Sequence, residues 1–133
     1  MPYSVAVSPD GQYIVSTLAG DVTHVVAMRE NLEAHALGAK HGITRFLVDV
    51  TGATNVDSAA ETYAFAYDEM QASAINRAAR VAVLVRPGDH SHDFVETVLR
   101  NAGLSVRIFT DRDEAVRHLL WRPGPDEPAP PRP

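Results

Sequence analysis

Residues 43–50 (ITRFLVDV) and 81–85 (VAVLV) decide the fold of this chain. Each contains an apolar run without polar alternation, which is typical of a parallel strand covered on both faces. The first run centres on Phe46, Leu47 and Val48, and Pro87-Gly88 stops the second. Apolar residues at helical spacing predict a long helix between them, over residues 58–79. Because a helix between two strands implies a parallel crossover, we predict that the two runs are adjacent central strands.

The segments before residue 43 predict a β-hairpin followed by a helix. Tyr3, Val5 and Val7 alternate at period two, residues 8–11 (SPDG) form a turn sequence, and residues 12–18 (QYIVSTL) are rich in β-branched and aromatic side chains. A helix is then expected from Asp21, ending near Gly38 or Gly42. Its predicted apolar stripe comprises Val22, Val25, Val26, Leu32 and Ala36.

The segments after residue 85 predict a further helix, strand and helix. The first helix has an apolar stripe and Gly103 as its C-terminal stop, and the last begins at a capping box, Asp111-x-x-Glu114. The stripe comprises Phe94, Val95, Val98, Leu99 and Ala102. In the strand, the apolar residues Leu104, Val106 and Ile108 alternate with polar ones, as in an edge strand. The predicted fold is α/β, with a mixed five-stranded sheet, an N-terminal β-hairpin and about four helices.

Length and composition predict one domain over residues 1–121 and a disordered, proline-rich tail over residues 122–133. The chain has 133 residues, a net charge of −5 and no cysteine, and six of its nine prolines lie in that tail. An acidic chain is not expected to bind nucleic acid. We expect no signal peptide and no transmembrane segment, and therefore a cytoplasmic protein.

Common cofactor motifs are missing from the sequence. There is no dinucleotide-binding G-x-G-x-x-G run, and Lys40 is the only lysine, so a phosphate-binding P-loop has no candidate. Without cysteine, thiol catalysis and thiolate metal sites are excluded. We therefore expect no cofactor and no enzymatic activity.

Candidate site residues follow the first predicted central strand. Asp49 and Thr51 lie where that strand ends, the place where open α/β sheets bind ligands, although Asp49 also fits a structural role in the loop. Asp57 precedes Ser58, which is a candidate phosphoacceptor at a helix start. Ser58-x-x-Glu61 is also a capping box, and the two interpretations are compatible.

Two further groups suggest binding. Tyr63 and Tyr67 could line an apolar ligand pocket or belong to the core stripe of the long helix, and the alanine-rich faces of that helix could pack against a partner, including a second copy of the chain. His90 and His92 are candidate metal ligands. Two ligands so close in sequence rarely bind one metal ion without a third ligand from a distant part of the chain, so we expect no metal site.

The element order, residues 49–52 (DVTG) and the helix start at residues 55–58 (NVDS) resemble the STAS superfamily. Residues 47–49, 80–82 and 106–111 (VRIFTD) are similar to its SpoIIAA-like branch, whose fold is shared with CRAL-TRIO lipid-transfer domains. The resemblance implies a bacterial regulatory domain. The run Asp57-Ser58-Ala59-Ala60 departs from the D-S-[ST]-G pattern of phosphorylatable antagonists.

The expected function is a non-enzymatic STAS or SpoIIAA-like domain that binds a partner protein or a small apolar, lipid-like ligand. The alternative is an anti-sigma-factor antagonist switched by phosphorylation at Ser58. A metal-dependent or histidine-dependent enzyme is the third hypothesis.

Overall fold

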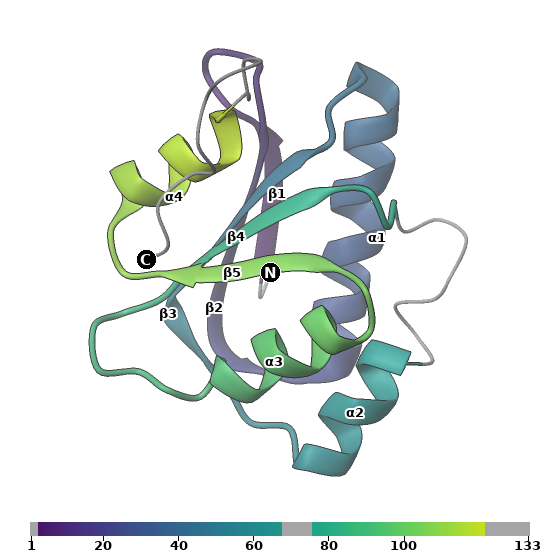
Figure 1. Cartoon of the computed structure of the whole chain (residues 1–133), viewed down its shortest axis with the longest axis vertical. Helices are drawn as coiled ribbons and strands as arrows, with labels where there is room; N and C mark the ends of the chain where they lie inside the picture. The colour runs from purple at the N-terminus through teal and green to yellow at the C-terminus, as the bar shows by residue number, and fades with distance from the viewer. Residues whose placement is uncertain (1–2, 68–75, 122–133) are drawn as a thin grey trace.

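A computed structural model describes residues 3–67 and 76–121 and shows a mixed five-stranded sheet with four helices (Figure 1). The strands lie in the order β1-β2-β3-β4-β5. Their bounds are β1 Tyr3–Val7, β2 Ile14–Val22, β3 Arg45–Asn55, β4 Arg80–Leu84 and β5 Ser105–Phe109. The helices are α1 His24–His41, α2 Ala59–Tyr67, α3 Asp93–Asn101 and α4 Arg112–Leu120. The predicted fold class and hairpin are confirmed, because β1 and β2 pair antiparallel and all other pairs are parallel.

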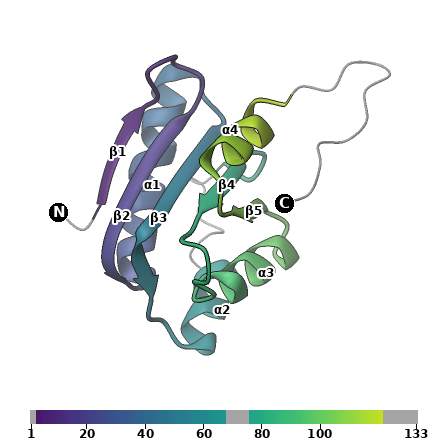
Figure 2. The same cartoon turned by 90° about the vertical axis from the view of Figure 1, so that its left-hand side faces the viewer.

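Three helices cover one face of the sheet and α4 covers the other (Figure 2). Crossovers between parallel strands are right-handed in nearly all proteins. Since each crossover here moves one strand further in the same direction, the connecting helices α1, α2 and α3 lie on the same face. The alternation of β4 reflects this arrangement: Val81 and Val83 face α1–α3, whereas Ala82 and Leu84 pack with α4.

The two apolar runs are adjacent central strands, as predicted. Phe46 pairs with Val81 and Leu47 with Ala82, and both Leu47 and Ala82 are completely buried. The runs are not uniformly inaccessible, because Val48, Val81 and Val83 are only half-buried. These three valines line the cavity described below, which explains their remaining exposure.

Helix α1 begins at His24, three residues after the predicted start, because Asp21 continues β2 and Thr23 caps the helix by accepting a hydrogen bond from the Val26 amide. The helix ends at Gly42, whose φ of 67° is left-handed. Its predicted apolar stripe is wrong: Val25 and Leu32 are exposed, and the buried face comprises Glu30, Ala34, His35 and Gly38.

Two other helix predictions need correction. Helix α2 comprises Ala59–Tyr67, and residues 68–75 of the long predicted helix lie outside the described residues. Residues 76–79 form a turn, so the prediction that the helix reaches residue 79 is wrong. In α3, Phe94 is exposed, whereas Val98, Leu99 and Ala102 are buried as expected. The proline-rich tail lies outside the described residues.

Candidate functional site

A cavity of about 120 Å³ lies between the sheet and the layer formed by α1, α2 and α3. Helix α1 packs on β1 and β2, α3 packs on β5, and α2 packs on α3. This spacing leaves the α1–α3 side of the middle strands incompletely covered, and their valines form the floor of the cavity. The apolar lining residues include Leu18, Val48, Val50, Val81, Val83, Phe65, Leu99, Val106 and Ile108.

Glu30 is the polar residue that distinguishes this cavity. It projects from the middle of α1, is only 3% exposed and lines the cavity. Its Oε2 accepts a hydrogen bond of 3.0 Å from the hydroxyl of Ser16, which lies on the buried face of β2. Burial raises the pKa of the Glu30 carboxyl to about 7, because an ionised carboxylate is poorly solvated there. Glu30 therefore changes its protonation state near neutral pH.

Two histidines on the cavity wall are held in their uncharged form. His35 stacks on Phe46 with ring centroids 4.4 Å apart, and its Nδ1 accepts a hydrogen bond of 3.0 Å from the Asn76 amide. His92 is also buried, and its Nε2 has no hydrogen-bond partner in the described part of the chain. Burial lowers the pKa of both histidines, so neither supplies a positive charge at neutral pH.

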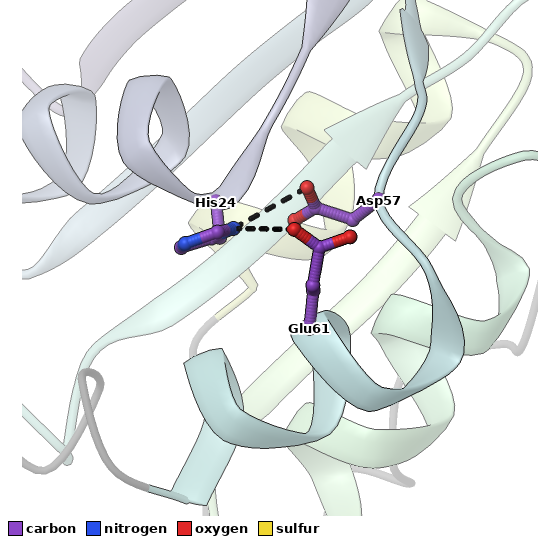
Figure 3. A group of neighbouring side chains, drawn as sticks. All are labelled: His24, Asp57 and Glu61. Carbon is purple, nitrogen blue, oxygen red and sulfur yellow. Dashed lines mark hydrogen bonds and ion pairs between the residues drawn. The ribbon is translucent and has the colours of Figure 1, made fainter.

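At one end of the cavity, His24 lies against Asp57 and Glu61 (Figure 3). His24 Nδ1 is 3.3 Å from Asp57 Oδ1 and 3.7 Å from Glu61 Oε2. The fold brings these residues together because β2 and β3 end in register, Val22 opposite Asn55, and each strand is followed closely by a helix start.

This histidine–carboxylate group is the only one within the described residues with three or more donor atoms close enough to share a metal ion; its donor atoms lie within 4.8 Å of one another. One imidazole and two carboxylates are suitable ligands for a divalent cation. The same groups also have partners without a metal, because His24 Nδ1 lies next to an oxygen of each acid, and Glu61 additionally accepts a hydrogen bond from the Ser58 amide. We therefore interpret the group as a polar contact that joins the start of α1 to the start of α2.

Ser58 forms the capping box that the sequence predicts. Its hydroxyl oxygen accepts a hydrogen bond of 3.1 Å from the Glu61 amide, and Glu61 Oε1 accepts one of 3.0 Å from the Ser58 amide. The hydrogen bond from the Ser58 amide is the main cause that lowers the pKa of Glu61. Ser58 is nevertheless exposed. The structural role is therefore present, and the hydroxyl is accessible from solvent.

The predicted binding residues do not converge on one site. Asp57 lines the cavity, but Asp49 lies on the α4 side of the sheet. Asp49 Oδ2 accepts a hydrogen bond of 2.6 Å from Arg112, and its Oδ1 accepts one of 2.7 Å from the Thr51 hydroxyl. The prediction that Asp49 and Thr51 lie where the strand ends is wrong, because β3 continues to Asn55. Their contacts are structural, as in the alternative interpretation, and join the middle of β3 to the start of α4.

The aromatic residues of α2 also differ from the prediction. Phe65 is buried against α3 and lines the cavity, whereas Tyr67 is exposed. The side chain of Tyr63 lies outside the described part of the structure. Among the described side chains of α2, Thr62 and Phe65 are buried, and the predicted tyrosine stripe is incorrect at Tyr67.

His90 and His92 have separate environments. His90 Nδ1 is 2.9 Å from Asp93 Oδ2 on an exposed surface, whereas His92 is buried and lies 3.6 Å from Asp89 Oδ2. The two imidazoles pair with different carboxylates and do not share a centre. The residues that sequence reasoning overlooked are Glu30 and Ser16. A stripe of small residues on α1, Ala27, Ala34 and Gly38, has Glu30 in its middle and could have indicated a buried acid.

No protein-family model matches the chain, and no curated protein matches it either. Within residues 3–67 and 76–121, no helix combines the length and the hydrophobicity that a bilayer span requires.

Proposed function

We propose that this protein is a non-enzymatic binding domain that holds a small apolar molecule in the cavity between the sheet and α1–α3. The observation that carries this proposal is the cavity itself, with about 120 Å³ of space and mainly apolar walls. An engineered apolar cavity of about 150 Å³ binds benzene, so a ligand of about six non-hydrogen atoms is the appropriate size. Removing such a molecule from water provides the driving force.

The finer classification is part of the same proposal. The order β-β-α-β-α-β-α-β-α and the N-terminal hairpin support a SpoIIAA-like domain of the STAS superfamily. A cytoplasmic, bacterial regulatory role follows from that resemblance. A ligand cavity is compatible with such a role, because ligand binding can change which surface a partner protein recognises.

A titration with benzene, followed by amide NMR of the ¹⁵N-labelled protein, tests the cavity proposal. We expect saturable shifts at cavity residues such as Val83 and Leu99. Ala27→Leu should abolish these shifts, because Ala27 lines the cavity. Ala39→Leu is the matched control, since Ala39 is exposed on the same helix. Absence of saturable shifts in the unmodified protein, or equal losses in both variants, would contradict the proposal.

A second candidate function is a phosphorylation switch at Ser58. It is favoured by the exposure of Ser58 at the N-terminus of α2, where the helix dipole stabilises an added negative charge. Mass spectrometry of the protein from the cells that naturally make it tests this function. We expect a phosphate on Ser58 that Ser58→Ala removes without a new site appearing. A chain that is unmodified in growing and in starved cells would rule the switch out.

A further inference from the structure

The cavity has an unbalanced set of charged groups. Its wall includes the carboxyl groups of Glu30, Asp57 and Glu96. Neither lysine nor arginine lines it within the described part of the chain, and residues 68–75 contain no lysine or arginine in their sequence. The histidines His35 and His92 are uncharged at neutral pH. The third imidazole on the wall, His24, already lies against Asp57 and Glu61. A ligand with a negative head group would therefore meet acids without a compensating cation.

Two of the three acids already have partners. Asp57 pairs with His24, and Glu96 Oε2 accepts a hydrogen bond of 2.6 Å from the Ile108 amide. Glu30 differs, because its hydrogen bond comes from the neutral hydroxyl of Ser16, and the charged group that acts on it, Glu33, is also an acid. A buried carboxylate of this kind is stabilised strongly by a cation within hydrogen-bond distance.

We infer that the ligand of this cavity is a small apolar primary amine, whose ammonium group pairs with the Glu30 carboxylate while its hydrocarbon part packs against the valines of β3 and β4. This inference rests on the proposed function and adds the chemical class of the ligand. The apolar walls supply affinity for the hydrocarbon, and the carboxylate supplies selectivity over alcohols and acids.

The pairing makes binding depend on pH. Free Glu30 is protonated below about pH 7, because burial raises its pKa, and an aliphatic amine stays protonated up to about pH 10. Below pH 7, Glu30 must therefore lose its proton before it can pair with the ammonium group. The affinity of the protein for the amine should fall by about tenfold for each pH unit below 7. Between pH 7 and 10 the affinity should be nearly constant.

The other ionisable groups near Glu30 are not expected to produce this profile. Glu33 is exposed on the same helix, and Asp57 and Glu96 are already paired. His35 and His92 gain a proton only below their ordinary range, because burial lowers their pKa. Their protonation would add positive charge and would weaken amine binding further at acidic pH.

Three probes of the same shape test the inference: cyclopentylamine, cyclopentanol and cyclopentanecarboxylate, titrated by calorimetry at pH 8 and pH 5. We expect the amine to bind at least about tenfold more tightly than the alcohol at pH 8 and to lose this advantage at pH 5, where its affinity should be about 100-fold lower than at pH 7. The acid should bind most weakly at pH 8. Glu30→Gln should remove the amine preference while leaving alcohol binding intact, and Glu33→Gln should change neither.

The outcomes separate this inference from the proposed function. If the alcohol binds and the amine does not bind more tightly, the cavity is a binding site but the amine class is wrong. The amine class is equally wrong if Glu30→Gln retains the amine preference. If none of the three probes binds at either pH, the inference and the proposed function both fail.

Discussion

The Ser58 side chain is compatible with both hypotheses for it, a helix cap and a phosphoacceptor. Its hydroxyl accepts the Glu61 amide hydrogen and is still exposed, so the structure contains the cap and leaves the hydroxyl accessible. The cap was readable from the sequence because S-x-x-E spacing is a local property of a helix start. Phosphorylation depends on a second protein, and no local spacing encodes that.

Ser58→Ala should lower the free energy of unfolding by about 1 kcal/mol, because the Glu61 amide loses its acceptor. Ser58→Asp should stay close to the unmodified protein, since aspartate is a comparable N-cap. Urea unfolding of the three proteins measures both effects. Equal stability of the alanine variant and the unmodified protein would show that the cap does not contribute.

Glu30 makes stability depend on pH independently of any ligand. Burial raises its pKa from 4.5 to about 7, so between these values the folded protein holds a proton that the unfolded chain has lost. The free energy of unfolding should therefore decrease as pH rises from about 4.5 to 7 and should not change further above 7 through this group. The full difference amounts to about 3 kcal/mol.

Glu30→Gln should remove this dependence. The variant should be more stable than the unmodified protein by up to about 3 kcal/mol at pH 8 and close to it at pH 4. Urea unfolding at both pH values measures the difference, with Glu33→Gln as the exposed control on the same helix. A difference that is the same at pH 4 and pH 8 would contradict the ionisation of a buried Glu30.

At the scale of elements, strands were predicted better than helix faces. The runs at residues 43–50 and 81–85 are central strands because an unbroken apolar sequence has no face suited to water. The stripe predicted for α1 was wrong because its buried face carries Glu30, His35 and Gly38, which hydrophobic periodicity counts as polar or neutral. Glu30 and His35 face the sheet because they line the cavity. Gly38 faces it because the helix lies too close to Ile43 and Phe46 for a larger side chain.

Gly38 marks that close contact and provides a test of it. A Cβ atom at this position would lie 2.6 Å from the Ile43 carbonyl oxygen and 3.0 Å from Phe46 Cζ. Helix propensity alone would make Gly38→Ala stabilising by about 1 kcal/mol. We expect it to be destabilising by about 1–3 kcal/mol instead, because the backbone at Ile43 and the Phe46 ring must shift to accommodate the added methyl group.

Thermal and urea unfolding of Gly38→Ala measure the sign of this effect. Ala39→Gly is the control, since residue 39 is exposed on the same helix and should lose only about 1 kcal/mol through propensity. A Gly38→Ala protein that is as stable as the unmodified one would mean that α1 does not approach β3 as closely as the structure indicates.

At the scale of the whole molecule, the cavity is a consequence of topology. Three crossovers in one direction place three helices on one face, and α4 alone lies on the other. On the three-helix face, α1 packs on β1 and β2, and α3 packs on β5. The space above the middle strands is therefore not filled by side chains of either helix. The order of elements along the chain and the adjacency of β3 and β4 were predictable from the sequence. The gap between α1 and α3 depends on helix spacing, which short apolar motifs do not specify.

This cavity should make the whole molecule sensitive to pressure. Unfolding eliminates internal voids, so the unfolding volume change is negative, on the order of tens of mL/mol, and scales with the void that disappears. Ala27→Leu fills part of the 120 Å³ cavity and should reduce the magnitude of this change, whereas Ala39→Leu on the exposed side of α1 should not. Pressure unfolding followed by tryptophan fluorescence measures all three proteins, since Trp121 is the only tryptophan. If Ala27→Leu shows the same volume change as the unmodified protein and the control, the space between the sheet and α1–α3 is not an empty cavity in solution, and the binding proposal built on it loses its structural basis.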